Sequence, residues 1–369
     1  MNQLFRWDQM GLFLLALAAG ILPFAVPEVC AAALREGLTL CSGPLLLSLF
    51  PFLVVSRLLI QCPESDLLAL PFRLAAWGIG IRTPCAARVL CIGFLGGFAP
   101  AASAAAQAVR TGQLTAEEAD ALLPACICSG PSFVVLTVGQ SLLGSAELGV
   151  LLFASQITAN YLTAALLNRF AGMHSVKPGS AAPASPAPPR LDEILADAAI
   201  TYCKLCGFIL FFRMLAAGAG ALLPAGAGTL CSILLEVCSG CDLASRTGRW
   251  GSLLCCAALS VQGLSVLLQV RTICPPEMTL RPLYRARMLH LPLSLALFYL
   301  LLPGGEADVF STLPARVLLM RRVPPDCALL VFAVCCMAAC TLRSGIRQVE
   351  QKQMARNAGG CCINSKTLL

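Results

Sequence analysis

Val89-Leu-Cys-Ile-Gly-Phe-Leu-Gly-Gly-Phe-Ala-Pro-Ala-Ala102 is the stretch of sequence that decides the fold, and Ala125-Cys-Ile-Cys-Ser-Gly-Pro-Ser-Phe133 is its later counterpart. Both are apolar enough to lie in a bilayer, yet they carry glycine and proline where a simple spanning helix would carry leucine. A backbone that breaks at membrane depth must be buried in protein or line a cavity, because lipid cannot satisfy the freed N–H and C=O groups. Such breaks, especially when they are paired in two halves, point to the binding site of a transporter.

The composition excludes a soluble globular protein. Of the 369 residues, 58% are hydrophobic and 12% are charged, and the mean hydropathy is +0.80. Long apolar runs recur along the chain, so we predict an all-α, polytopic helical membrane protein with about eight spanning helices plus broken or re-entrant half-helices. The net charge of +7 comes from arginines and lysines in short loops and the C-terminal tail. This is typical of cytoplasmic segments, so we expect a lipid bilayer and no nucleic acid as partner.

The 21 cysteines lie mostly inside apolar runs, where they act as small hydrophobes. Two Cys-x-x-Cys pairs occur, at 203–206 and 238–241, but a zinc or redox site would need them to face one another in a soluble pocket. Only His174 and His290 could assist them, and no HExxH, Gly-x-Ser-x-Gly or P-loop motif is present. We therefore expect no metal, no other cofactor and no enzymatic activity.

A proline-rich stretch divides the chain into halves. Lys177-Pro-Gly-Ser-Ala-Ala-Pro-Ala-Ser-Pro-Ala-Pro-Pro-Arg190 has the composition of an extended linker. At the start of the chain, the apolar run Gly11–Val26 favours an uncleaved first span over a signal peptide. The basic stretch 271–287, which we interpret as a loop, and the basic tail are both expected on the cytoplasmic side. The predicted segments are a first transmembrane helix with its lead-in (1–36), an N-terminal Gate-like repeat (37–168), a Pro/Ala/Ser-rich linker (169–190), a C-terminal Gate-like repeat (191–290), C-terminal transmembrane helices (291–342) and a basic cytoplasmic tail (343–369).

One break has the composition of an anion site. Thr115 and Glu118 form a capping-box pattern, which starts a helix that runs towards Ser129-Gly130-Pro131. Ser129 suits an N-cap and proline suits a first turn, so we expect a break at Ser129-Gly130 and a half-helix that begins near Pro131. The free N–H groups and positive dipole of such a half-helix attract anions. The alternative is an ordinary proline kink in a spanning helix.

The two halves resemble each other. Pro51-Phe-Leu-Val-Val-Ser-Arg-Leu-Leu aligns with Gly207-Phe-Ile-Leu-Phe-Phe-Arg-Met-Leu, which places Arg57 over Arg213. Two breaks follow in the same order in each half, so we predict a duplicated unit, with chance similarity as the alternative. These breaks are Gly96-Gly97 and Ser129-Gly130 in the first half, and Ser239-Gly240 and Gln262-Gly263 in the second.

Glu236 is the one carboxylate in an apolar run, beside the Ser239-Gly240 break. Ionisable residues inside a membrane are costly and are functional by default, as a ligand of a coupling ion, a proton carrier or a substrate contact. The alternative is a glutamate at the water boundary, or one that caps a broken helix.

Several of these motifs occur together in a known family. They are, in order, Leu49-Phe-Pro-Phe-Leu-Val-Val-Ser56, Gly93-Phe-Leu-Gly-Gly-Phe-Ala-Pro100, Glu117-Glu-Ala-Asp-Ala-Leu-Leu123, Cys128-Ser-Gly-Pro-Ser-Phe133, Leu234-Leu-Glu-Val-Cys-Ser-Gly240 and Leu259-Ser-Val-Gln-Gly-Leu-Ser265. Over residues 40–300 the chain thereby resembles the sporulation integral membrane protein YlbJ/SpoVV family of spore-forming Firmicutes, which carries nucleoside-recognition Gate domains.

The resemblance implies a Gate-type, nucleoside-transporter-like helical fold and a multi-pass protein of the mother-cell or outer forespore membrane. It also implies transport of dipicolinate from the mother cell. Two motifs depart from the family pattern. The family has a small residue–Gly–Tyr–Pro motif where this chain has Gly97-Phe-Ala-Pro100, and an Asn-x-Ser-x-Pro-type segment where it has 126–131. The missing tyrosine hydroxyl and asparagine amide bear on the substrate more than on the fold.

We therefore expect a sporulation-associated transporter of dipicolinate or a similar small anionic metabolite, with Glu236 coupling transport to an ion. The alternatives are a nucleoside-type transporter and a non-transporting scaffold or assembly factor for the spore envelope. Further copies of the chain or other sporulation membrane proteins are possible protein partners. The expected substrate-binding residues are Gly96, Gly97, Ser129, Gly130, Pro131, Ser132, Ser239, Gly240, Gln262 and Ser265.

Overall fold

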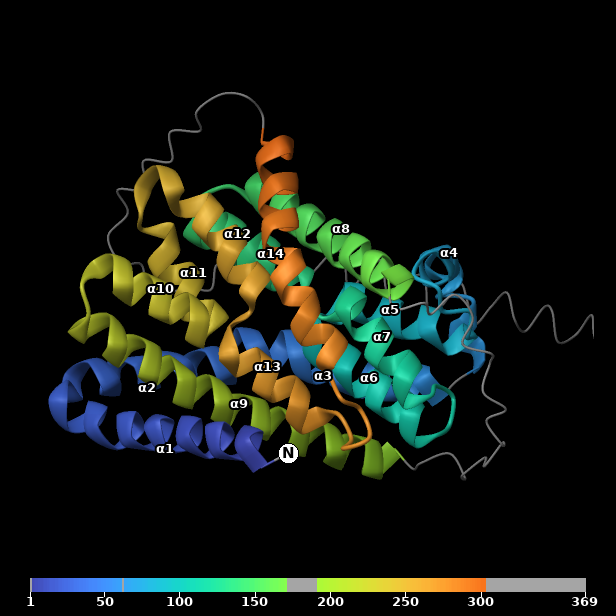
Figure 1. Ribbon diagram of the computed structural model, residues 1–369, viewed down its shortest axis with the longest axis horizontal. Helices are drawn as coiled ribbons and strands as arrows, with labels where there is room; N and C mark the ends of the chain where they lie inside the picture. Colours follow the sequence, from blue (N-terminus) through green and yellow to red (C-terminus); the bar gives the residue numbers. More distant parts are fainter. Residues whose placement is uncertain (1, 62, 171–190, 303–369) are drawn as a thin grey trace, which may run out of the picture.

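The computed structural model describes residues 2–61, 63–170 and 191–302, and this part of the chain is helical throughout, without strands (Figure 1). Three helical runs are long and apolar enough to cross a membrane, namely Ala146–Phe170, Leu191–Leu222 and Gly248–Ile273. A fourth span results if the bent pair Phe13–Ala25 and Pro27–Ser42, which turns by 110°, counts as one. The prediction of an all-α polytopic membrane fold is confirmed. Most of the predicted linker, the last predicted span and the basic tail lie outside the described residues.

The chain enters the bundle through α1 (Asn2–Ala25) and α2 (Pro27–Ser42), which pack against the long helix of the second half. Gly43 separates α2 from α3 (Pro44–Gln61). The apolar run 37–60 predicts a single second span, but the chain breaks at Gly43 inside it, so the bounds of that prediction are wrong. The short elements η1 (Pro63–Asp66) and α4 (Leu70–Gly78) follow.

The first half continues with a helical hairpin and an interrupted helix. A Cβ on Gly93 would lie 3.2 Å from the Cβ of Ala101. In a continuous helix, eight residues would separate these positions by about 12 Å, so the chain turns back on itself between them. The segment at 127–131 instead interrupts a helix whose two parts do not pack along each other. The elements are α5 (Pro84–Gly96), α6 (Phe98–Arg110), α7 (Ala116–Cys126), the π-helical η2 (Ser132–Leu142) and α8 (Ala146–Phe170).

The second half repeats this order. The two helices on either side of Glu236 form a second hairpin, because a Cβ on Gly240 would lie 2.8 Å from the Cα of Ile233. An interrupted helix follows, with its break at Gln262, and then a long final helix. The elements are α9 (Leu191–Leu222), α10 (Ala225–Leu235), α11 (Val237–Ser245), η3 (Gly248–Trp250), α12 (Gly251–Val261), α13 (Gly263–Ile273) and α14 (Arg281–Leu301).

Two predicted boundaries differ from the structure. The break expected at Ser239-Gly240 lies at Glu236, because that glutamate caps the following helix. The predicted basic loop 271–287 is helical from Arg281 onwards, where Pro282 takes a position in the first turn that proline tolerates.

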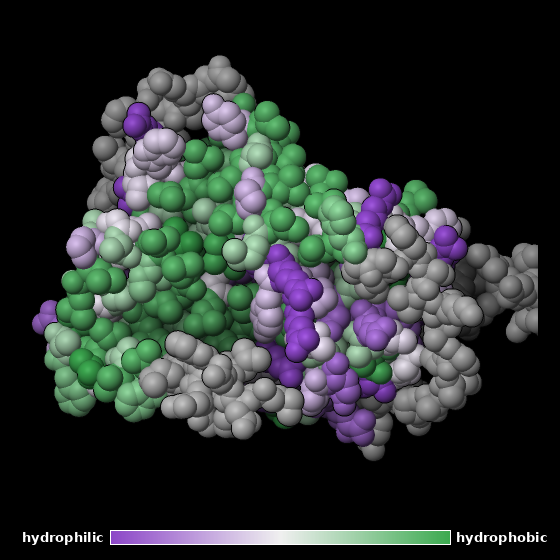
Figure 2. Space-filling view, in the orientation of Figure 1, coloured by the Kyte–Doolittle hydropathy of each residue, from purple (hydrophilic) through white to green (hydrophobic). Residues whose placement is uncertain are grey.

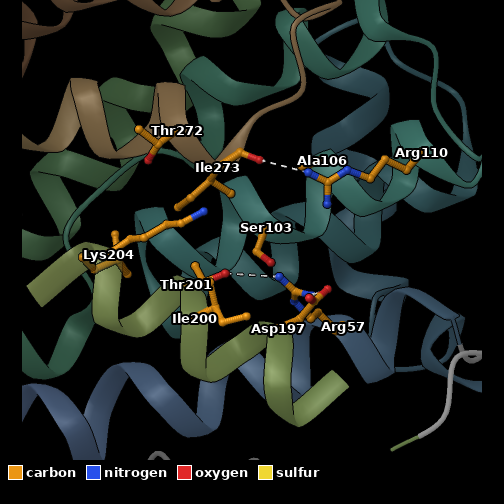
Figure 3. Close-up of a pocket in the computed structure, with 11 residues that line it drawn as sticks. Arg57, Ser103, Ala106, Arg110, Asp197, Ile200, Thr201, Lys204, Thr272 and Ile273 are labelled. Atoms are coloured by element: carbon orange, nitrogen blue, oxygen red, sulfur yellow. Dashed lines mark hydrogen bonds and ion pairs between the residues drawn. The ribbon is translucent and has the colours of Figure 1, made fainter. Parts of the chain in front are cut away.

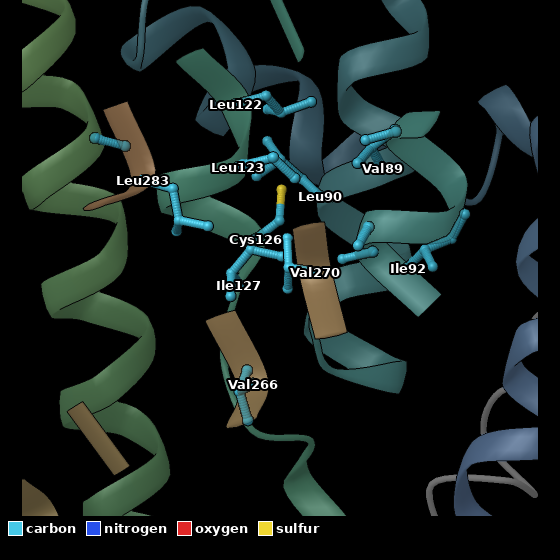
Figure 4. Close-up of a cluster of buried hydrophobic side chains, with 14 of the residues drawn as sticks. Val89, Leu90, Ile92, Leu122, Leu123, Cys126, Ile127, Val266, Val270 and Leu283 are labelled. Carbon is cyan, nitrogen blue, oxygen red and sulfur yellow. The ribbon is translucent and has the colours of Figure 1, made fainter. Parts of the chain in front are cut away.

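The two interrupted helices and the hairpin α5–α6 share one apolar core. Figure 4 shows side chains from α5, α7, α13 and α14 converging on the segment that leaves α7. Figure 2 shows a broad apolar surface over α2 and α10–α12, whereas polar side chains gather near the ends of α6 and α7 and the start of α14. One side of the molecule thus suits lipid, and one end suits water. The labelled core residues are Val89, Leu90, Ile92, Leu122, Leu123, Cys126, Ile127, Val266, Val270 and Leu283.

Helix α7 begins with the predicted capping box. The Glu118 N–H donates to the Thr115 hydroxyl at 3.1 Å, and the Glu118 carboxylate accepts from the Thr115 N–H at 3.0 Å. One turn into the helix, Asp120 is buried and accepts hydrogen bonds from the Thr279 N–H at 2.8 Å and the Leu280 N–H at 3.1 Å. The Asp120 carboxylate thereby attaches α7 of the first half to the start of α14 in the second.

We predict that Asp120→Ala destabilises the protein by about 2–3 kcal/mol, because the buried Leu280 N–H and the N–H and hydroxyl of Thr279 lose a charged acceptor. Asp242→Ala is the matched control. Asp242 pairs with Arg246 four residues later, at a site where the arginine side chain is 61% exposed, and such pairs contribute about 0.3–0.5 kcal/mol. Unfolding of both variants in one detergent measures the difference. Equal stabilities of Asp120→Ala and Asp242→Ala would contradict the attachment of α7 to α14 through Asp120.

Candidate functional site

The tip of the first hairpin touches the first interrupted helix. Gly97 lies between α5 and α6 with φ +81°, and a Cβ there would lie 2.7 Å from the backbone nitrogen of Gly130. Only glycine permits both this φ and this approach. A Cβ on Gly130 would in turn lie 3.4 Å from the Gly96 oxygen. The structure thus brings together three predicted site residues, and we call this contact the first crossing.

The second half has an equivalent contact with the roles exchanged. Here the glycine belongs to the interrupted helix, because Gly263 has φ +72° and its Cβ would lie 2.9 Å from the backbone nitrogen of Glu236 at the tip of the second hairpin. Gln262, just before it, also adopts a left-handed conformation, with φ 62°. We call this contact the second crossing. It contains the predicted residues Glu236 and Gln262.

The start of η2 differs from the prediction. Ser129 is buried, and its hydroxyl does not cap the helix that follows. Pro131 occupies the N-cap position and lacks a capping side-chain bond, so the predicted Ser129 cap is wrong. Pro131 and Ser132 are half-buried at the beginning of the half-helix. The break itself spans 127–131, as the Ser-Gly-Pro sequence indicates.

Glu236 caps the hairpin tip of the second crossing. Its side chain is buried, and its two carboxylate oxygens accept from the Cys238 N–H at 2.9 Å and the Ser239 N–H at 2.7 Å. The structure therefore shows the capping arrangement that the sequence left open as an alternative. Gly240, one residue later, is packed against Ile233 of α10 and closes the hairpin.

Among the described residues, the second crossing contains an amide oxygen without a donor. Gln262 is buried, and within the described part of the chain its Oε1 has no hydrogen-bond partner. Ser265 accepts from Gln269 Nε2 at 2.9 Å, and the Oε1 of Gln269 is likewise unpartnered there. Gln269 lies further along α13, so the oxygen atoms at this crossing that can accept further bonds from a hard cation or a donor group are those of Gln262 and Glu236.

Arg287 of α14 connects the two crossings. One guanidinium nitrogen donates to the carbonyl of Ile127, directly after α7, and the other donates to the carbonyl of Ser260 at 3.3 Å, two residues before Gln262. Arg287 is 8% exposed. Its Nε has no partner among the described residues, and no described carboxylate forms an ion pair with it. Among the described residues, this buried cation is held by two backbone carbonyls alone.

A polar network surrounds this arginine. Asn160 of α8 also donates to the Ile127 carbonyl, at 3.2 Å. Gln156 of α8 donates to the Ser260 hydroxyl at 3.0 Å, and the ring of His290 is 3.2 Å from the Gln156 carbonyl. The network therefore joins α8, α12 and α14 around the point where both interrupted helices break.

Gln156 and Asn160 form a polar stripe in the apolar run 147–167, and Ser260 belongs to the motif at 259–265, so the sequence indicates these three residues. It did not indicate Arg287. Arg287, His290 and Ser294 are spaced by three and four residues, and all three are buried on one face of α14. That spacing is the signal that could have identified them. The interpretation of 271–287 as a loop concealed it.

Comparison of the chain with protein-family models, with curated proteins and with solved structures found no match in any of the three. The resemblance to the YlbJ/SpoVV family therefore stays a prediction.

The two crossings differ in charge. Each break places one helix C-terminus beside one N-terminus, so the helix-dipole charges of about −0.5 and +0.5 largely cancel. What remains is the Arg287 guanidinium, which is bound to the end of α7 at the first crossing, and the Glu236 carboxylate at the second. This arrangement can hold an anion near the start of η2 and a cation near Glu236.

We predict opposite effects for two glycine-to-alanine substitutions. Gly97→Ala should destabilise the protein by more than about 1–2 kcal/mol, since the Cβ meets the Gly130 backbone at a positive φ. Gly207→Ala, inside α9 with open space around it, should stabilise it by about 0.5–1 kcal/mol. Unfolding midpoints in detergent compare the two, and a tolerated Gly97→Ala would exclude the backbone contact.

Proposed function

We propose that the protein is a membrane transporter that moves a small anionic metabolite, which binds at the first crossing beside Arg287. The observation that carries this proposal is a buried guanidinium without a carboxylate partner among the described residues, at the point where two interrupted helices break. Removing a charge from water costs several kcal/mol unless a partner compensates it. Two carbonyls compensate it in part, and an anionic substrate would complete the compensation.

The surrounding backbone supports the same ligand class. The N-terminus of η2 begins directly after the Ser129-Gly130-Pro131 break, and α6 begins at Gly97 on the other side of the first crossing. Both N-termini present first-turn N–H groups that an anion can contact directly, although the dipole charges of the paired helix ends largely cancel. Carboxylates are the groups that helix N-termini and a planar guanidinium bind best. Transporters place their sites at such half-helix ends.

Dipicolinate is the anion we propose for the first test. Its support is the resemblance of six sequence motifs to the YlbJ/SpoVV family, which also supports a role in sporulation and a place in a membrane of the developing spore. A planar ring with two carboxylates would present one carboxylate to Arg287 and the other to the start of η2.

For coupling we propose the second crossing. The buried Glu236 carboxylate can take up a proton, and together with the Gln262 Oε1, which has no partner among the described residues, it offers oxygen ligands for a sodium ion. Because Glu236 also caps α11, a bound cation there would act on the tip of the second hairpin.

Uptake by proteoliposomes tests the proposal. Reconstituted wild-type protein should accumulate radiolabelled dipicolinate, and Arg287→Gln should reduce the rate by about 100-fold, which corresponds to about 2.7 kcal/mol for a buried charged contact. Arg285→Gln is the matched control, because Arg285 lies on the same helix two residues away and is exposed. It should retain wild-type uptake. Size-exclusion profiles establish that both variants are folded.

Three outcomes would contradict the proposal. Wild-type uptake by Arg287→Gln would exclude the arginine from the site. Uptake of uridine but not of dipicolinate would replace the anionic substrate with a nucleoside. Absence of uptake of dipicolinate, phosphate and uridine by a folded wild-type protein would favour a scaffold without transport.

A further inference from the structure

A separate polar cavity lies at the end of the bundle, where the two halves meet. Its volume is about 150 Å³, which is room for about five waters at ~30 Å³ each and is smaller than the 300–1,000 Å³ of typical drug-sized sites. Four helices that contact one another in a ring enclose it, namely α3 and α6 from the first half and α9 and α13 from the second. It is distinct from both crossings, because none of the crossing residues lines it.

The cavity is positively charged. Arg57, Arg110 and Lys204 line it together with the single carboxylate of Asp197, which gives a formal charge of 3 − 1 = +2 (Figure 3). A cavity lined by charge of one sign attracts and concentrates ions of the opposite sign. A small anion is therefore the ligand class that the lining favours.

The three cations differ in how far they are already engaged. Arg57 is buried, pairs with Asp197 and donates to the Thr201 hydroxyl at 3.3 Å. Arg110 makes one long contact, 3.5 Å to the Ile273 carbonyl. Lys204 is exposed and makes no hydrogen bond or ion pair with any described residue. The Arg57–Asp197 pair is therefore part of the cavity lining, whereas Lys204 and Arg110 are free to bind a ligand.

Ser103 adds a hydroxyl to the lining of the cavity. The residue is 3% exposed, and its hydroxyl has no hydrogen-bond partner in the part of the chain that the structure describes, so it can donate to a ligand. Figure 3 shows its oxygen on the side of the cavity, between Arg57 and Arg110. A hydroxyl that can donate, beside two cations without a carboxylate partner among the described residues, is an arrangement suited to a small anion.

We propose that this cavity binds a small oxyanion, a carboxylate or phosphate group held by Lys204 and Arg110 with a hydrogen bond from Ser103. The two chemically equivalent sources are a soluble anion and the phosphate of a lipid headgroup. The site needs neither Arg287 nor transport, so it can be tested independently of the proposed function.

Titration of the full-length protein in neutral detergent with inorganic phosphate, and separately with dipicolinate, tests the site by calorimetry. Lys204→Gln should weaken phosphate binding at least about 10-fold, as loss of a charged hydrogen bond does, and Ser103→Ala should weaken it less. Lys204 is chosen because it has no partner whose loss would unfold the protein. Arg246→Gln, which removes one charge in the α11–α12 connection outside the cavity, should bind as the wild type does.

The source of the anion follows from the same titration in nanodiscs. Phosphatidylglycerol should weaken phosphate binding relative to phosphatidylcholine if the headgroup occupies the cavity, and should leave it unchanged if a soluble anion does. Arg287→Gln should keep phosphate binding, which separates this site from the first crossing. Equal phosphate affinity of wild type and Lys204→Gln, or no binding of either anion by folded wild type, would overturn the proposal.

Discussion

The structure depends on one constraint: four interruptions of helical backbone lie inside a bundle that lipid surrounds, so protein atoms must satisfy every polar group they free. Each interruption has its own solution. The glycines at 97 and 263 allow hairpin tips and interrupted helices to meet backbone to backbone. Glu236 accepts from the N–H groups that begin α11, and Arg287 donates to the carbonyls that end α7 and approach the break at Gln262. Asn160 adds a second donor to one of those carbonyls.

These contacts differ in how much displacement they allow, and the difference is compatible with the transport function that we propose. The glycine contacts within each half are close, and a displacement there meets backbone atoms directly. Between the halves, Arg287 is held by two carbonyls that it can exchange for a ligand, and a guanidinium has five donors to distribute. Each half can thus behave as a unit, while the region between them contains adjustable polar contacts. Alternating access in transporters with repeated halves uses this kind of division.

The sequence predicted the positions of the breaks better than the residues that stabilise them. Gly96-Gly97, Ser129-Gly130 and Gln262-Gly263 were identifiable because glycine and proline are unfavourable in spanning helices, which is a local property. The third break lies at Glu236 because a carboxylate can cap a helix that starts one residue later. Gly240, four residues after Glu236, is used for hairpin packing. Arg287 could not be placed by local rules. Its partners are 160 and 27 residues away in the chain, and its neighbouring arginines made a helix resemble a cytoplasmic loop.

The two proposed anion sites are connected by the helices that link them. Both α6 and α13 begin at a crossing and end at the cavity, where Arg110 contacts the Ile273 carbonyl. At 1.5 Å per residue, they run about 15–18 Å from one to the other. Their dipoles are parallel, with positive ends at the crossings and negative ends at the cavity. An anion in the cavity therefore lies at the unfavourable end of both dipoles, which is why Lys204 and Arg110 are needed there. At the first crossing the opposed helix ends largely cancel, so the Arg287 guanidinium supplies the positive charge for an anion there.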